Sequence, residues 1–191
     1  MEKQQTTVII EGKGGKYRWL AITALLLAIG TILRLVSPNF GVIMPNWTIA
    51  MYCLAMILVR PSLGQAAGIG VVAGALGLVT SKSIFPYANL ASEMAGAITC
   101  CLLVKYNFGL TIGRVNLRPA LIGLVTTFAS GLTFVTLTKL VLGLPMQVYL
   151  YGMLPVVFAT AGINTVVTQI LYLPARKIFS SQTETREGKS L

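Results

Sequence analysis

The sequence contains no histidine and no aspartate, and only 10 % of its 191 residues are charged. Its five carboxylates are all glutamates, and four of them lie near the ends of the chain. Hydrolases and metalloenzymes rely on paired acids, histidine triads or clusters of oxygen ligands. The composition therefore argues against an enzyme, and we expect no metal site and no cofactor.

Cysteine is also scarce. The three cysteines, Cys53, Cys100 and Cys101, fall inside apolar runs, their number is odd, and none forms a CxxC pair. A disulfide framework or a thiolate metal site needs several cysteines at defined spacings. We therefore interpret these three residues as small core side chains.

Apolar residues, in contrast, make up 55 % of the chain, and the mean hydropathy is +0.78. A soluble domain carries about 25 % charged residues, far more than this chain has to cover a globular surface. A membrane-spanning helix takes roughly 20 apolar residues. The sequence therefore predicts an all-α integral membrane protein, a bundle of six transmembrane helices surrounded by membrane lipid.

Prolines, glycines and charges divide the chain into segments. A basic, glycine-containing leader occupies residues 1–18, and a polar tail occupies residues 175–191. Arg60-Pro61 ends the second apolar run, Pro119 stands at a helix start, and Pro174 ends the sixth run. The six-helix domain, residues 19–174, is expected to have helices at about 19–36, up to 59, 62–80, 88–104, 119–142 and 151–173.

Positive charge is uneven between the two sides of this topology. Of the 15 lysines and arginines, 12 fall on the side of the N-terminus, and 3, Arg34, Lys82 and Lys139, fall on the other side. Cytoplasmic loops carry the positive excess in membrane proteins. Both termini are therefore expected in the cytoplasm. Because the net charge of +10 is spread over segment ends, we expect no nucleic acid partner.

Small residues recur at one-turn spacing in two helices. Ala24 and Ala28 form such a pair in the first helix, and Gly64/Gly68 and Gly70/Gly74 form two pairs in the third. Small side chains let another helix approach closely in lipid. From the residues alone, packing inside the bundle is the favoured interpretation of these pairs, and an outward-facing contact surface is the alternative for Ala24 and Ala28.

Glu93 is the one carboxylate within the apolar body of the chain. An acid inside a membrane helix costs several kcal/mol unless it is paired or hydrated, so it normally marks a pathway or a ligand site. The alternative is a carboxylate just outside the hydrocarbon, near a helix N-terminus. Proton or sodium coupling usually uses several buried acids or histidines. With one acid and no phosphate-binding GxxxxGK[ST] motif, a transporter of this kind would need an energising partner.

Amides and aromatic rings surround Glu93 in the connections on its side of the membrane. Such a cluster suits a small planar or zwitterionic solute, although aromatic residues at this depth also form the interfacial belt of membrane proteins. The residues in question are Asn46, Trp47, Phe85, Tyr87, Asn89, Gln147, Tyr149 and Tyr151.

Taken together, six helices, cytoplasmic termini, an outer-side pocket and the Ala24/Ala28 pair resemble the substrate-binding S component of bacterial energy-coupling factor (ECF) transporters, in particular the tryptophan-type members. The similarity runs from about residue 21 to residue 178. It rests on the order of segments 21–30 (AITALLLAIG), 68–74 (GIGVVAG), 85–86 (FP), 141–145 (VLGLP), 163–165 (INT) and 172–174 (YLP).

This resemblance implies a subunit of the cell membrane that captures tryptophan from outside and delivers it inward with a membrane T component and two cytoplasmic ATPases. In that family the alanine pair docks on the T component, which would place Ala24 and Ala28 on an external surface. Trp47 and Tyr87 would stack on the ring. The implied substrate-binding residues are Asn46, Trp47, Tyr87, Asn89, Glu93, Gln147 and Asn164, the last matching a family asparagine.

Two segments depart from the tryptophan-type pattern. Met44-Pro45-Asn46 lacks a lysine and an aspartate that those members tend to carry, and Ser92-Glu93 replaces an aspartate and a lysine. Lys82 or Lys139 could hold a carboxylate instead. The alternatives are an S component for another vitamin or small metabolite, a stand-alone channel or facilitator, and a ligand-free membrane subunit.

Overall fold

The structure is a computed structural model of the 191-residue chain that describes residues 17–37, 46–106, 110–112 and 115–187. The predicted leader up to residue 16 and the connection containing Met44-Pro45 lie outside these ranges. The described elements are α1 (Arg18–Val36), α2 (Trp47–Val59), α3 (Leu63–Thr80), α4 (Ala88–Lys105), β1 (Thr111–Ile112), β2 (Val115–Asn116), α5 (Arg118–Leu142), the π-helical segment η1 (Val148–Met153) and α6 (Leu154–Glu187).

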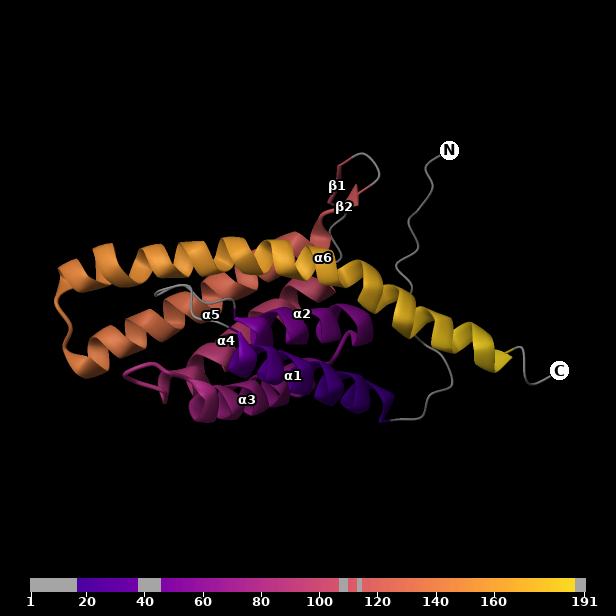
Figure 1. The fold of residues 1–191 in the computed structure, drawn as a ribbon, viewed down its shortest axis with the longest axis horizontal. Coiled ribbons are helices and arrows are strands. Elements are labelled where there is room, and N and C mark those ends of the chain that lie inside the picture. The colour runs from indigo at the N-terminus through magenta and orange to yellow at the C-terminus, as the bar shows by residue number, and fades with distance from the viewer. Residues whose placement is uncertain (1–16, 38–45, 107–109, 113–114, 188–191) are drawn as a thin grey trace.

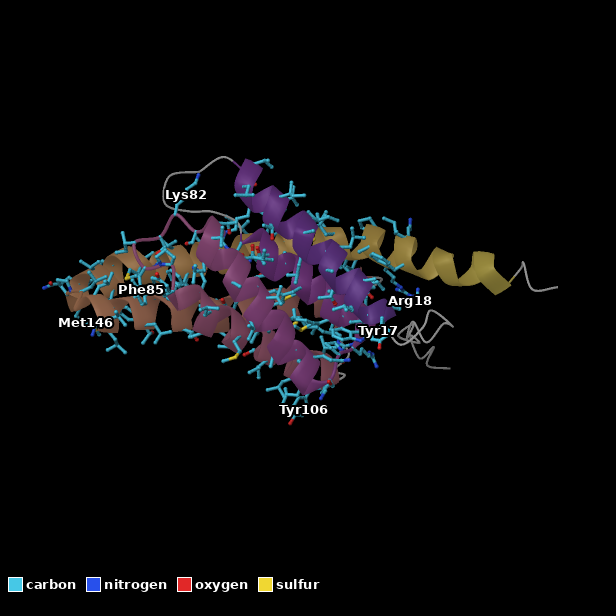
Figure 2. All side chains as sticks on the ribbon, turned by 90° about the horizontal axis from the view of Figure 1, so that it is seen from below. Tyr17, Arg18, Lys82, Phe85, Tyr106 and Met146 are labelled. Carbon is cyan, nitrogen blue, oxygen red and sulfur yellow. The ribbon has the colours of Figure 1, made fainter. Side chains whose placement is uncertain are left out.

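The helices lie side by side along the long axis of the molecule, and α5 and α6 reach past the others at one end (Figure 1). Lys82 and Met146 lie at that end, and Tyr17 and Arg18 lie at the opposite end (Figure 2). Successive helices therefore run in alternate directions, and the start of α1 and the end of α6 share one end of the bundle. The predicted all-α bundle of six helices is confirmed. The short antiparallel hairpin of β1 and β2 between α4 and α5 was not predicted.

Four helices, α1, α3, α5 and the η1–α6 segment, are long and apolar enough to cross a membrane. Helix α2 has 13 residues, or about 20 Å at 1.5 Å per residue, against roughly 30 Å of hydrocarbon. Eleven of its 13 residues are buried, among them Tyr52, Leu54 and Met56. This short helix is therefore the core of the bundle, and α1, α4, α5 and α6 pack around it.

Local sequence signals explain several helix ends. Asn46 accepts a hydrogen bond from the backbone N–H of Ile49 at the start of α2, and Ser62 and Gln65 form a capping box at the start of α3. Arg60 ends α2 in the left-handed region, with φ of 47°, directly before Pro61. Pro119 lies in the first turn of α5, as predicted.

The predicted end of the sixth helix at Pro174 is wrong, because α6 continues through Pro174 to Glu187. Proline removes one backbone hydrogen bond, a loss that packing against neighbours can offset. Tyr172, Ala175 and Phe179 follow one face of α6 across the proline, and all three are buried in the core. The Arg18 guanidinium also donates to the Phe179 carbonyl at 3.3 Å. The segment taken for the start of a polar tail is thus helical and packed.

The glycine pairs of α3 have different surroundings. A Cβ atom at Gly70 would lie 2.6 Å from Met94 Cα, and one at Gly74 would lie 2.7 Å from Leu90 Cα, so this pair brings α3 against α4 as predicted. For Gly64 and Gly68 the prediction of packing inside the bundle is wrong. Both are exposed, and a Cβ atom there would meet nothing within 4 Å.

This difference predicts opposite effects of the same substitution. Gly70→Ala should lower the free energy of unfolding by about 1–3 kcal/mol, because α4 must move to admit the methyl group. Gly68→Ala, the matched control on the exposed face, should be neutral or stabilising by up to about 1 kcal/mol, because alanine has the higher helix propensity. Thermal unfolding in detergent measures both. Equal destabilisation by the two variants would contradict the described packing of α3.

Candidate functional site

Three of the predicted site residues meet inside the bundle: Asn46 at the start of α2, Glu93 in the second turn of α4, and Asn164 in α6. The Asn46 Nδ2 atom donates to Glu93 Oε1 at 3.1 Å. The Asn46 backbone N–H donates to Asn164 Oδ1 at 3.2 Å, and Asn164 Nδ2 donates to the Asn46 carbonyl oxygen at 3.2 Å. Glu93 is 1 % exposed and Asn164 is 0 % exposed. Residues far apart in sequence therefore form one buried polar cluster.

The cluster arises where α2 begins. A helix N-terminus leaves backbone N–H groups without intrahelical partners, and in an apolar bundle these groups need polar side chains. Asn46 caps α2 with its own side chain, and Asn164 binds both backbone polar groups of Asn46. Asn164 Nδ2 also donates to Thr127 Oγ1 of α5 at 3.1 Å. Helices α2, α4, α5 and α6 are thus joined by hydrogen bonds at this level.

Several polar atoms of this region are buried and have no hydrogen-bond partner in the described part of the chain. They are Arg34 Nη1, Trp47 Nε1, the Tyr52 hydroxyl and Glu93 Oε2. Tyr52 and Arg34 both lie within electrostatic reach of Glu93. Buried polar groups are paired in the great majority of native structures. These buried donors, together with the carboxylate oxygen of Glu93 that has no partner, could therefore hydrogen-bond to a polar ligand.

Glycines determine how closely the polar side chains approach. A Cβ atom at Gly96 would lie 2.5 Å from the Tyr52 hydroxyl, so only glycine at this position of α4 leaves room for that group next to Glu93. Gly30 of α1 packs against the Trp47 carbonyl oxygen and the Met51 side chain. Arg34 lies one turn after Gly30 on the same face, so its side chain is directed at the start of α2.

The other predicted site residues are placed elsewhere. Tyr87 is 65 % exposed in the connection before α4, where its ring lies 6.0 Å from that of Phe85 between centroids. Asn89 is buried, but its side chain packs beside Gly77 of α3 and donates to the Pro86 carbonyl oxygen at 2.7 Å. Gln147 is exposed, next to Met146 at the tip formed by α5 and η1 (Figure 2). The structure does not bring these three into the cluster.

The alanine pair of α1 faces away from the bundle. Ala24 and Ala28 are exposed, whereas Ile22, Leu26 and Leu27 of the same helix are buried. The favoured interpretation from the residues alone, packing inside the bundle, is therefore wrong for this pair. Leu25, which is 53 % exposed, lies on the same side. The outward surface of α1 around the alanine pair is thus apolar.

Sequence reasoning missed Arg34, Tyr52 and Thr127 as members of this region. Arg34 was visible as the one cation inside the first apolar run, and its one-turn spacing from Gly30 indicates its inward face. Tyr52 and Thr127 gave no signal, because a tyrosine or threonine in a membrane helix is common and is placed only by its neighbours.

Comparison with known proteins identifies the family. Residues 16–180 match the family described as tryptophan transporter TrpP. The chain belongs to this family. A Clostridium perfringens protein described as a probable tryptophan transport protein is 29 % identical over 167 residues, covering 80 % of this chain and 88 % of its own length. A Bacillus subtilis protein with the same description is 27 % identical over 158 residues, covering 82 % and 90 %. No solved structure matches the chain.

Membership of the TrpP family confirms the resemblance to the tryptophan-type S components and the assignment as a transporter and not an enzyme. It also agrees with the multi-pass membrane architecture seen in the helices. The departures at Asn46 and Glu93 therefore occur within a recognisable family member.

Loss of the central amide should destabilise the bundle even without a ligand. Asn164→Leu leaves the backbone N–H of Asn46 without its partner and removes one hydrogen bond from the Asn46 carbonyl oxygen, which still accepts from the start of α2, so the free energy of unfolding should fall by about 1–3 kcal/mol. Thr165→Leu is the matched control, because the Thr165 hydroxyl bonds only to Ala161 O of its own helix, and it should change stability by no more than about 0.5 kcal/mol. Thermal unfolding in detergent compares them. Equal stability of the two variants would remove Asn164 from the framework of the site.

Proposed function

We propose that this chain is the substrate-binding S component of an ECF-type importer and that it captures tryptophan at the cluster of Asn46, Glu93 and Asn164. The observation that carries the proposal is the burial of Glu93 with one carboxylate oxygen hydrogen-bonded to Asn46 and the other without a partner. A buried carboxylate is costly in a membrane helix unless something compensates it. The ammonium group of an amino acid supplies the missing charge and the missing donor.

The described contacts favour this function over the alternatives. A channel needs polar groups along a path through both leaflets. Gln169 is one of the few polar residues of the inner half, and its side-chain amide is already hydrogen-bonded to backbone groups. Its Oε1 accepts from Ala120 N at 3.1 Å, and its Nε2 donates to Asn116 O at 2.9 Å. A ligand-free subunit gives no reason for unpaired polar atoms beside Glu93. Family membership favours tryptophan over another vitamin or metabolite.

Delivery inward requires partners, which we propose to be a membrane T component and two cytoplasmic ATPases. The exposed pair Ala24 and Ala28 offers a helix surface that a partner helix can approach closely. Arg60, Lys105 and Arg118 lie at helix ends on the side of the start of α1, which supports cytoplasmic termini. The bundle would topple within the membrane on docking and release the solute inward.

The first test is binding by the chain alone. The purified protein in detergent should bind tryptophan in a calorimetric titration without its partners. Glu93→Gln should weaken binding by at least about 1.5 kcal/mol, roughly tenfold, because a charge-assisted hydrogen bond is lost. Ala91→Phe, a change at an exposed position of the same helix, should bind as the wild type does.

A panel of vitamins and other amino acids is titrated in the same way to identify the substrate. Binding of a different panel member would keep the importer function and replace the substrate. Absence of binding for every member of the panel would favour the ligand-free subunit. Unchanged tryptophan affinity of the Glu93→Gln variant would remove Glu93 from the site.

Docking is tested separately from binding. Ala24→Phe should leave tryptophan binding unchanged but abolish uptake when the T component and ATPases are co-expressed, because the bulky ring blocks close helix approach on the exposed face of α1. Ala91→Phe again serves as the control and should retain uptake. If Ala24→Phe loses binding and uptake together, the alanine pair stabilises the bundle instead of contacting a partner.

A further inference from the structure

Arg34 and Glu93 approach the same region from different helices. Arg34 comes from the last turn of α1, where its neighbour Gly30 packs against the start of α2, and Glu93 comes from the second turn of α4. The two opposite charges interact electrostatically. Yet Arg34 Nη1 and Glu93 Oε2 are both buried and have no hydrogen-bond partner in the described part of the chain.

Such a pair is costly as it stands. Removing two charges from water is compensated only when their geometry is good and their remaining hydrogen bonds are satisfied. Here each member keeps an unused atom, so the pair lacks that compensation. The Tyr52 hydroxyl, which interacts electrostatically with Glu93, is likewise buried with no hydrogen-bond partner within 3.5 Å among the described residues. A ligand with one positive and one negative group would satisfy both charges together.

We propose that Arg34 and Glu93 bind the two charged groups of a free α-amino acid, Arg34 the carboxylate and Glu93 the ammonium group. The site would then recognise the zwitterion as well as the indole ring. This inference rests on the proposed function and adds a specificity-determining residue to it. Because both charged groups of an α-amino acid are attached to one carbon atom, they need a cation and an anion at opposite sides of one small space.

The chemistry of arginine fits the carboxylate better than either outer lysine does. A guanidinium is planar and presents parallel N–H donors that match a carboxylate in a bidentate contact. Lys82 is exposed in the connection before α4, at the edge of the molecule (Figure 2). Lys139 lies in the last turn of α5, near the tip of the α5–α6 pair. Arg34 is the outer-side cation with a buried, unpaired nitrogen among the described residues.

The test compares ligands that each lack one charged group. Wild-type protein in detergent is titrated with tryptophan, with tryptamine, which lacks the carboxylate, and with indole-3-propionate, which lacks the ammonium group. Tryptophan should bind at least about tenfold more tightly than either analogue, as expected for the loss of a charge-assisted hydrogen bond.

The variants assign each charge to its ligand group. Arg34→Met should weaken the binding of tryptophan at least about tenfold and change the affinity for tryptamine by no more than about twofold, so that the ratio of the two affinities falls towards one. Arg34→Lys should restore part of this ratio. Glu93→Gln should do the same for the ratio of tryptophan to indole-3-propionate. Lys139→Met, a matched loss of a cation, should leave both ratios unchanged.

Other outcomes overturn the inference in distinguishable ways. If wild-type protein binds tryptophan but not more tightly than tryptamine, the carboxylate is not recognised, and this holds whether or not the Arg34 variants fold. If Arg34→Met weakens all three ligands equally, Arg34 supports the bundle only. If Lys139→Met removes the preference, the carboxylate binds at the tip of α5. These three results leave tryptophan capture intact, whereas wild-type protein that binds no tryptophan contradicts the proposed function itself.

Discussion

The start of the short helix α2 is the constraint on which the site depends. Helix α2 has 13 residues and is buried among its neighbours, so its first turn exposes unpaired backbone groups to an apolar interior. Water cannot satisfy such groups inside a membrane bundle. Asn46 and Asn164 therefore bind the backbone at this point, and Asn46 also binds Glu93. The polar residues of the site are in the first place the residues that let α2 begin inside the bundle.

Close helix packing then directs these polar groups towards one another. The Gly70 position of α3 lies against the Glu93 carbonyl oxygen and Met94 Cα, and Gly74 lies against Asn89 and Leu90. This contact fixes the rotation of α4, so that Glu93 turns away from α3 and towards α2. Gly96, one turn later, admits the Tyr52 hydroxyl. Packing by small residues, the main source of helix association in lipid, thus determines the electrostatics of the site.

Much of this architecture follows from sequence, because membrane helices have strong length and charge signals. Glu93 and Asn164 are identifiable as buried polar residues. The placement of Asn89, Tyr87 and Gln147 could not be predicted from the sequence. Near the start of a helix, a polar side chain can face the site or a neighbouring helix, and only the packing of α3 against α4 turns Asn89 towards Gly77. The end of α6 is misjudged for a similar reason. Proline is a local signal, whereas the contacts of Tyr172, Ala175 and Phe179 that hold the helix beyond it are tertiary.

Helix α1 connects the site with the outer surface of the bundle. Its 19 residues form one continuous helix with Ala24 and Ala28 on the exposed face and Arg34 directed inward in its last turn. Arg34 lies six positions after Ala28, about 9 Å along the axis. A partner that shifts α1 against α2 would therefore move Arg34 relative to Glu93, while Glu93 stays tied to Asn46 and α2. Separating the two charges in this way would weaken the hold on a zwitterion without any change in the residues that contact its ring.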